Sequence, residues 1–384
     1  MLTVGYWDQN YPEKRNIIYS GEHTEAVTYI PIHRKKNMLV SRMISRNVPC
    51  SDVMKNVQEF HYHSAGRKPY DLIHCYNGTC AVPDMPWVST SEGIMPRMFG
   101  IEKNGLCAKA WKRYAYELTA GKYCKALFFL CRDTYEGELR QLRQDYGGVY
   151  YKDIAVKAKV LHPPQKINIT QEELQEKFSD TGERLELMLV GSAFWLKGGK
   201  ETVEVLEPFA KEHPIHLTIV SDFNTLRAEM YGYTKEDYRA CLQRIQRNHD
   251  WITVYNKLPN RQVLKLMNKS HIGLLPSYGD SYGFSVLEFQ ASGCPVITTD
   301  HRAFPEINPS DCGWLTQIGG KHNGILERRE DNKKQMSCII EDILEHPEQI
   351  VKKAQKSVER IREQHDPGKH AETLLAEYRK ALDK

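Results

Sequence analysis

The second half of the chain alternates short apolar runs with amphipathic stretches, and this alternation restricts the fold more than any other feature. The apolar runs have the length of strands, and segments with a 3.6-residue period separate them. Strands that are apolar throughout need cover on both faces, which connecting helices supply in a parallel sheet. The expected strands are 185–190, 215–220, 251–255, 271–275 and 294–298, and the expected helices are 202–211, 238–247, 261–268 and 286–291.

The first half is less regular but shows the same alternation. Two prolines, Pro163 and Pro164, then form a stiff extended linker, because each disfavours helix at the residue before it. The expected strands are 2–7, 27–30, 72–74, 87–90 and 127–130, with a helix at 108–118 and two C-terminal helices at 347–364 and 369–382. The sequence therefore predicts an α/β protein with two doubly wound Rossmann-like domains, 1–164 and 165–366, and a terminal helix in 367–384.

The composition is that of a globular protein. Of 384 residues, 41% are hydrophobic and 27% are charged, which excludes a disordered or fibrous chain. The densest apolar run, 126–131, is too short to span a bilayer, and no signal peptide is expected from the strand-like first residues. Ten cysteines without a Cys-x-x-Cys pair are expected to be reduced, so the predicted location is the cytoplasm.

Charge is spread unevenly along the chain. Residues 1–165 carry 23 Lys and Arg against 16 Asp and Glu, whereas the remainder carries 30 against 33. The first half therefore favours anionic partners, while a pI near 8.4 is too low to indicate nucleic acid. Segment 33–46 is either a peripheral contact with the inner membrane face or a lipid phosphate, or a solvated basic surface. Its basic residues are Arg34, Lys35, Lys36, Arg42 and Arg46.

The most informative segment is 274–298, where a buried strand leads into a glycine-bearing loop and then into a helix starting near Phe284. A helix N-terminus at the carboxyl end of a parallel strand favours a bound phosphate, and Gly283 allows close approach. Asp280 precedes the helix and Glu288 lies about one turn inside it. Carboxylates are better suited to accept hydrogen bonds from sugar hydroxyls than to face phosphate. Alternatively, Asp280 caps the helix and Glu288 is solvated.

This segment also carries a family resemblance. Asp280-Ser-Tyr-Gly-Phe-Ser-Val-Leu-Glu288, then Gly293-Cys-Pro-Val-Ile, Asp300 and Phe304-Pro-Glu-Ile307, closely resemble the Glu-x7-Glu motif of family-4 retaining glycosyltransferases, part of glycosyl transferases group 1. The resemblance implies the GT-B fold, in which two Rossmann-like domains face each other across a cleft and a C-terminal helix crosses back to the first. It further implies a UDP- or GDP-sugar donor, a sugar or glycolipid acceptor, and a role in polysaccharide or glycolipid biosynthesis. No tightly bound cofactor is expected.

The resemblance assigns roles to individual residues. Asp280 would contact hydroxyls of the donor sugar, the amides of Gly283 to Ser285 would hold sugar and phosphate oxygens, and Glu288 would bind the ribose. Lys197 matches the family lysine that neutralises the diphosphate, although Ser192 stands where an arginine is usual. Asp280 is also one methylene shorter than the usual Glu, which leaves the donor sugar open. The remaining donor contacts implied are Gly191, Ser192, Leu258, Ser281, Tyr282 and Phe284.

In the first half, Asp71-Leu-Ile-His74 resembles a family strand end, and Glu92 takes the place of a histidine that faces the reaction centre. Glu92 would either receive the proton of the acceptor hydroxyl or serve as a capping or paired residue. His61 and His63 belong to no visible metal cluster, and no Asp-x-Asp motif occurs. No metal is therefore expected, and Lys197 with the helix N-terminus would stabilise the departing diphosphate.

These observations predict a retaining glycosyltransferase that uses front-face displacement, with the donor on the second domain and the acceptor on the first. Two alternatives remain open. One is a related GT-B enzyme, an epimerase or a phosphorylase, and the other is a non-catalytic GT-B-like scaffold. An NAD-dependent Rossmann enzyme is disfavoured, because no Gly-x-Gly-x-x-Gly follows a strand.

Overall fold

The computed structural model describes residues 1–7, 14–18, 25–32, 61–62, 70–98, 105–179, 184–225, 228–318 and 324–383. They form two compact units, one made of 1–164 with 365–384 and the other of 165–364. The basic segment with Arg34, Lys35, Lys36, Arg42 and Arg46 lies outside the described residues. Among the helices that are described, none has the length and apolarity needed to cross a bilayer.

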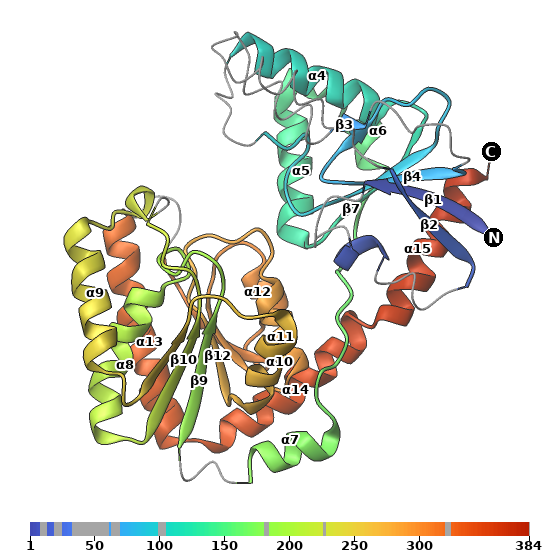
Figure 1. The fold of residues 1–384 in the computed structure, drawn as a ribbon. Coiled ribbons are helices and arrows are strands. Elements are labelled where there is room, and N and C mark those ends of the chain that lie inside the picture. The colour runs from blue at the N-terminus through green and yellow to red at the C-terminus, as the bar shows by residue number, and fades with distance from the viewer. Residues whose placement is uncertain are drawn as a thin grey trace. The chain divides into compact units, whose positions relative to one another are not determined.

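The first unit is built on a parallel sheet of six strands in the order β2-β1-β4-β6-β7-β8 (Figure 1). Central strands β4 and β6 are buried along their whole length, as expected for a sheet covered on both faces. Their bounds are β2 (Val27–Ile32), β1 (Leu2–Trp7), β4 (Leu72–Tyr76), β6 (Trp87–Ser91), β7 (Cys124–Phe129) and β8 (Ala158–Val160). Two short strands, β3 (His61–Tyr62) and β5 (Thr79–Cys80), pair beside it.

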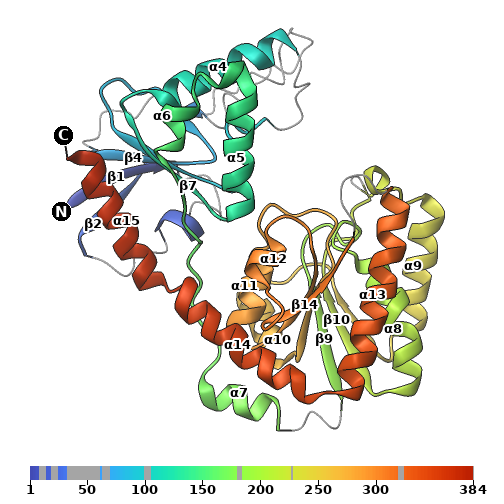
Figure 2. The same ribbon diagram turned by 180° about the vertical axis from the view of Figure 1, so that it is seen from behind.

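Different helices cover the two faces of this sheet. On one face lie α4 (Leu106–Ala120), α5 (Arg132–Gln144) and α6 (Tyr151–Ala155), and on the other lies α15 (Pro367–Leu382) (Figures 1 and 2). From α15, Leu374, Tyr378 and Ala381 pack against the apolar side chains of β1, β4, β6 and β7. The last helix therefore belongs to the core of the first unit, although 200 residues of the second unit intervene in sequence.

A buried polar network fastens α15 to the sheet. His74 of β4 bonds the Tyr378 hydroxyl at 2.6 Å through Nδ1 and Thr90 at 2.8 Å through Nε2. The Tyr378 hydroxyl in turn lies 3.3 Å from that of Tyr29. Burial, with a smaller contribution from His370, lowers the pKa of His74 to about 3. Burial lowers the pKa of His370 on α15 to about 3 as well.

These histidines predict a loss of stability in mild acid. Their folded pKa lies below the unfolded value, so their contribution is complete above about pH 6.5 and falls as pH drops toward 3. Between pH 7 and 5 each histidine is expected to remove about 2 kcal/mol of unfolding free energy. In the His74→Gln variant the decrease over this interval should be smaller by that amount, measured by urea unfolding. Equal decreases in variant and wild type would contradict the prediction.

The second unit contains another parallel six-stranded sheet, in the order β11-β10-β9-β12-β13-β14. Strands β10 and β11 lie on one side of β9, and β12, β13 and β14 lie on the other, so the strand order reverses between β9 and β12. Here Leu187 pairs with Ile272. The strands are β11 (Ile252–Tyr255), β10 (Ile215–Val220), β9 (Leu185–Val190), β12 (Ile272–Leu275), β13 (Val296–Thr299) and β14 (Gly313–Thr316).

Helices flank this sheet in two layers (Figures 1 and 2). One layer contains α8 (Gly199–Glu212), α9 (Lys235–Arg247) and α13 (Ile325–Glu345). The other contains α10 (Asn260–Lys269), α11 (Phe284–Ala291), α12 (Phe304–Ile307) and α14 (Glu348–Gln364), with α7 (Gln171–Lys177) beside α14. The apolar core lies between the first layer and the sheet, where Leu187, Leu189, Leu217 and Ile219 are fully buried.

The predicted α/β architecture of two doubly wound parallel sheets is confirmed, with small corrections. The fifth expected strand of the second unit begins at Val296 rather than Cys294, because Pro295 has no N–H for the ladder and the Cys294 thiol donates to Ser270 O at 2.8 Å. Eight described cysteines are free. Cys107 is disulfide-bonded, so the expectation that all cysteines are reduced is wrong at that position.

Candidate functional site

Two loops meet at the point where the strand order of the second sheet reverses. One follows β9 and contains residues 191–198, and the other follows β12 and contains residues 276–283. They are joined by a backbone hydrogen bond from Tyr278 N to Leu196 O at 3.0 Å. In open α/β sheets, ligands bind outside the carboxyl ends of the strands at such a reversal. The predicted donor residues from both segments therefore share one location.

Gly198 sets how closely the two loops approach. Its backbone is left-handed, with φ of 74°, and a Cβ at this position would lie 2.3 Å from Pro276 O. Any larger residue would push the β12 loop away or strain the turn. The close contact of Gly198 with Pro276 thus places Lys197 beside the loop that carries Asp280.

Lys197 and Asp280 form an ion pair between Nζ and Oδ2, although 83 residues separate them. Both side chains are largely buried, with 13% and 19% of their area exposed. Lys197 Nζ also donates to Gly279 O at 3.3 Å. The two predicted site residues therefore neutralise each other when no ligand is bound, and a ligand that binds either one competes with the pair.

Helix α11 begins directly after this loop, at Phe284. Gly283 occupies the N-cap with a left-handed φ of 95°, and a Cβ there would lie 2.5 Å from the Phe304 ring. The first amides of a helix have no partner within it, and they carry the positive end of its dipole. Asp280 Oδ1 accepts from Tyr282 N at 3.3 Å, which fixes the turn that leads into the helix.

The other predicted residues of this segment differ in exposure. Glu288 lies in the second turn of α11 and is 9% exposed. Tyr282 is buried and its ring packs on that of Phe284, with centroids 5.2 Å apart. Ser281 and Ser285 are half-buried. The start of α11 therefore presents backbone amides and the small side chains of Ser281 and Ser285. Asp280 and Glu288 flank these residues in the sequence.

Asn332 of α13 holds the β12 loop in place through hydrogen bonds. Its Nδ2 donates to Pro276 O at 3.2 Å and to the Tyr278 hydroxyl at 3.0 Å, while its Oδ1 accepts from Thr316 at 2.7 Å. The side chain is fully buried, and its amide groups all have hydrogen-bond partners. Such an amide fixes the loop, because releasing any one bond would leave a buried polar group unsatisfied.

A buried ion pair supports the β9 loop in the same way. Arg329 Nε lies 2.8 Å from Glu201 Oε1, and Glu201 has no exposed area. The Tyr233 hydroxyl donates to Glu201 at 2.9 Å and lies 3.0 Å from Trp195 O, a carbonyl of the β9 loop. Burial raises the pKa of Glu201, and the Arg329 charge opposes that rise. Neither Asn332 nor this ion pair was expected from the sequence, since Asn332 and Arg329 lie far along the chain from the loops.

The remaining predicted donor residues, Gly191, Ser192 and Leu258, follow the ends of strands β9 and β11. Gly191 begins the β9 loop, and its neighbour Ser192 is exposed and brings no charge. Leu258 is half-buried in the loop after β11, the edge strand of the sheet. The structure thus brings Gly191, Ser192 and Lys197 next to the α11 segment, while Leu258 lies two strands away from β9.

Glu92 lies in the first unit, after β6, and it is paired. Arg97 Nη1 contacts Glu92 Oε1 at 2.5 Å, and the Tyr76 hydroxyl donates to Oε2 at 3.3 Å. The Asn77 side chain accepts from Glu92 N at 3.0 Å. Two interpretations of Glu92 were open from the sequence. The geometry agrees with a paired residue, and a role of Glu92 toward the acceptor hydroxyl stays a prediction. Tyr76, Asn77 and Arg97 were missed, although Tyr76 and Asn77 closely follow the predicted strand 72–74, which carries His74.

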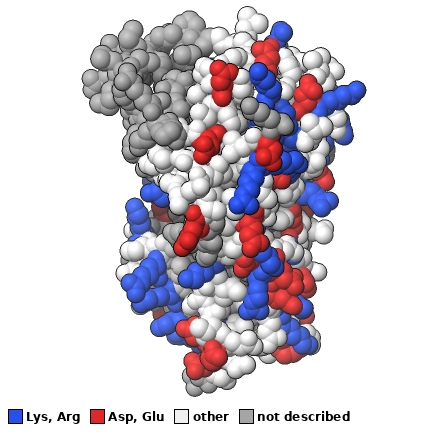
Figure 3. Space-filling model, turned by 90° about the vertical axis from the view of Figure 1, so that its right-hand side faces the viewer, with Lys and Arg blue, Asp and Glu red and all other residues white. Residues whose placement is uncertain are grey.

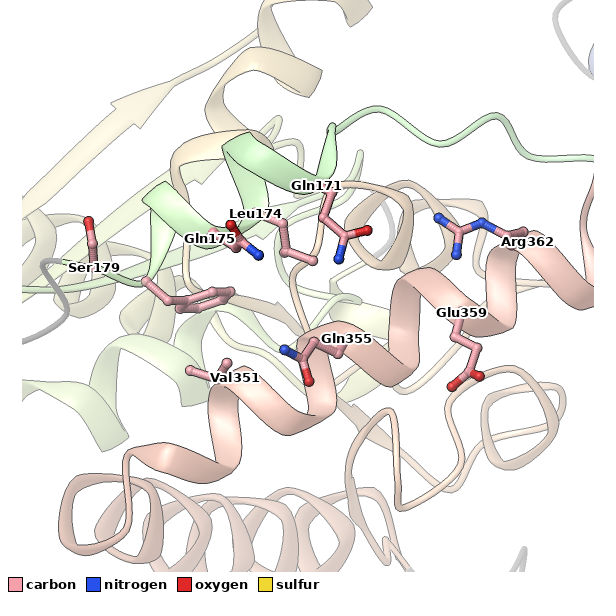
Figure 4. A pocket seen from close by; sticks show the side chains of 9 residues that line it. Gln171, Leu174, Gln175, Ser179, Val351, Gln355, Glu359 and Arg362 are labelled. Carbon is pink, nitrogen blue, oxygen red and sulfur yellow. The ribbon is translucent and has the colours of Figure 1, made fainter.

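In the part of the chain that the structure describes, other surface features indicate no alternative centre. Within the described ranges, no group of three or more His, Cys, Asp or Glu residues is arranged to hold a metal. Acidic and basic side chains both appear across the face in Figure 3, so charge there selects no class of partner. A groove of about 620 Å³ lies between α7 and α14 (Figure 4), but none of its lining residues is a predicted site residue.

The fold and the site define a two-domain α/β protein of the GT-B type with a loop–helix site at the strand reversal of its second sheet. The family model for glycosyl transferases group 1 matches residues 170–364, which is half of the chain. The chain belongs to this family. The matched residues all lie within the second unit, which carries Lys197, Asp280 and Glu288.

Solved structures share the fold over nearly the whole chain. A glycosyltransferase from Rickettsia africae is 14% identical, with a TM-score of 0.61 and coverage of 100% of this chain and 99% of that one. HepE of Anabaena, solved with UDP and glucose, is 12% identical at a TM-score of 0.61, covering 98% and 99%. WaaG, a glycosyltransferase involved in lipopolysaccharide biosynthesis, is 15% identical at 0.57, covering 97% and 99%. No curated protein matches the sequence significantly.

Proposed function

We propose that this protein is a retaining glycosyltransferase of family 4, a hexosyltransferase that moves a sugar from a nucleoside diphosphate to an acceptor hydroxyl. The donor binds the loops after β9 and β12 in the second unit, with UDP or GDP as its nucleotide. The acceptor is a sugar or glycolipid bound by the first unit, and the product enters polysaccharide or glycolipid biosynthesis.

One observation carries the proposal. Lys197 and Asp280 lie beside the amino end of α11, at the strand reversal of the second sheet. This part of the chain matches the family model for glycosyl transferases group 1. A cation and the amino end of a helix suit a diphosphate, and the carboxylates of Asp280 and Glu288 suit sugar and ribose hydroxyls. HepE, which shares the fold, has been solved with UDP and with UDP-glucose, which supports a uridine nucleotide as the first ligand to try.

The proposed chemistry uses the chain's own groups. Lys197 and the first amides of α11 stabilise negative charge on the leaving diphosphate, which is the group that bears the developing charge. Asp280 orients the donor sugar after releasing Lys197. Glu92, held by Arg97 and Tyr76, is the candidate to position the acceptor hydroxyl.

Isothermal titration calorimetry with UDP, GDP and ADP tests the donor site. The wild-type protein is expected to bind at least one of them, and Glu288→Gln should bind it about tenfold more weakly, because the ribose loses a charge-assisted hydrogen bond. Glu341→Gln, an exposed position on α13, is the matched control and should retain wild-type affinity. Absence of binding by the wild type, or equal affinity in all three proteins, would reject the site.

Product analysis separates the proposed activity from its alternatives. A glycosyltransferase forms a new glycoside from a donor sugar only when an acceptor is present. An epimerase converts the donor alone, a phosphorylase needs inorganic phosphate, and a scaffold leaves the donor unchanged under all three conditions.

A further inference from the structure

A second cation contacts the loop that leads into α11, and it comes from a strand outside the predicted site. Arg302 follows the carboxyl end of β13, next to β12 in the sheet. Its Nη1 donates to the backbone oxygen of Asp280 at 3.3 Å. Lys197 donates to the preceding carbonyl, that of Gly279, at the same distance. The two cations therefore contact consecutive carbonyls of one loop.

The charge balance of the predicted site explains why a second cation matters. Lys197 is the one cation among the predicted donor residues, and its charge is neutralised by Asp280. Glu288 adds a further negative charge close by on α11. A helix N-terminus contributes about half a positive charge, too little for a diphosphate that carries two or more negative charges. These groups alone therefore give the site little net positive charge with which to hold its proposed ligand.

We propose that Arg302 is a second diphosphate-binding residue, which acts with Lys197 on the phosphate oxygens of the donor. This inference rests on the proposed function. A guanidinium carries five N–H donors in a planar fork that matches phosphate oxygens. Arg302 thereby supplies the positive charge that the uncharged Ser192 does not.

The backbone at Arg302 allows a clean set of variants. Its φ is 51°, in the left-handed region, where the backbone of any residue other than glycine is strained. Arg302→Gly removes the guanidinium and relieves this strain. Arg302→Gln keeps most of the length without charge, and Arg302→Lys keeps the charge without the fork. Arg239→Gln, at an exposed position on α9, is the matched control for loss of one positive charge.

The experiment is calorimetric titration of each full-length variant with whichever of UDP, GDP or ADP the wild type binds most tightly, and with the corresponding monophosphate. Arg302→Gln and Arg302→Gly are expected to weaken diphosphate binding about tenfold, as for loss of one charged hydrogen bond. Arg302→Lys should lose less, and the monophosphate should be affected less than the diphosphate.

Three results would overturn the inference. One is diphosphate affinity in Arg302→Gln and Arg302→Gly that matches the Arg239→Gln control. Another is an equal loss in Arg302→Lys and Arg302→Gln, which would show that the charge is not what binds. A wild-type protein that binds no nucleoside diphosphate would overturn the proposed function and this inference together. Wild-type binding with unaffected Arg302 variants leaves the proposed function intact.

Discussion

Lys197→Met is expected to lower kcat/KM for sugar transfer by about 10²–10³-fold, the usual cost of removing one group that stabilises developing charge. The methionine retains the aliphatic length of the lysine, so it keeps the packing beneath Gly191 and removes the charge. Binding of the nucleoside diphosphate itself should weaken as well, because Lys197 is proposed to contact it directly. Steady-state kinetics and calorimetry on the same preparations measure both effects.

The partner variant Asp280→Asn makes this prediction discriminating. It breaks the same ion pair, yet it releases Lys197 and removes a negative charge near the proposed position of the phosphates. Its affinity for the diphosphate should equal or exceed that of the wild type, while sugar transfer falls. If both variants lost diphosphate affinity equally, the pair would be structural, and the assigned division of roles would be wrong.

Arg329→Met is expected to lower the unfolding free energy of the second unit by about 3–5 kcal/mol, because it leaves the carboxylate of Glu201 buried without its counter-ion. Burial already raises the pKa of Glu201, and loss of the Arg329 charge removes the largest effect that opposes that rise. The carboxylate should then be protonated at a higher pH. Urea unfolding monitored by far-UV circular dichroism measures the loss.

The double variant Glu201→Leu with Arg329→Met provides the control. Removing both charges leaves no uncompensated ion, so most of the lost stability should return. The double variant should nevertheless bind nucleotide more weakly than the wild type, since Tyr233 loses the Glu201 acceptor and with it a fixed position beside Trp195 O. A double variant less stable than Arg329→Met would show that packing dominates at this position.

Much of the architecture could be predicted from sequence because periodicity reports burial. The strands of the second sheet are short and continuously apolar, so β9 and β10 begin and end at the predicted residues. The helix α5 was missed for the opposite reason. Glu138, an ionisable residue, is buried on its inner face and interrupts the expected apolar stripe, and burial raises its pKa to about 8.

The candidate site divides in a similar way. Asp280, Gly283 and Glu288 are contiguous in sequence, and their spacing alone predicts a loop followed by a helix. The contact between Lys197 and Asp280 depends on how Gly198 packs under Pro276, which no local pattern encodes. Asn332 reaches the same loop from α13, where an asparagine on a helix normally indicates a solvated surface. Arg302 had a weak signal, as a charged residue just after a predicted strand.

The most direct measurement is a crystal structure of the full chain with UDP, or with GDP or ADP if one of those binds more tightly. The account predicts that the diphosphate lies against the amides of Gly283 to Ser285, with Lys197 moved from Asp280 to a phosphate oxygen and Glu288 at the ribose. A nucleotide bound elsewhere, with the Lys197–Asp280 pair intact and the start of α11 closed by the protein's own side chains, would contradict it.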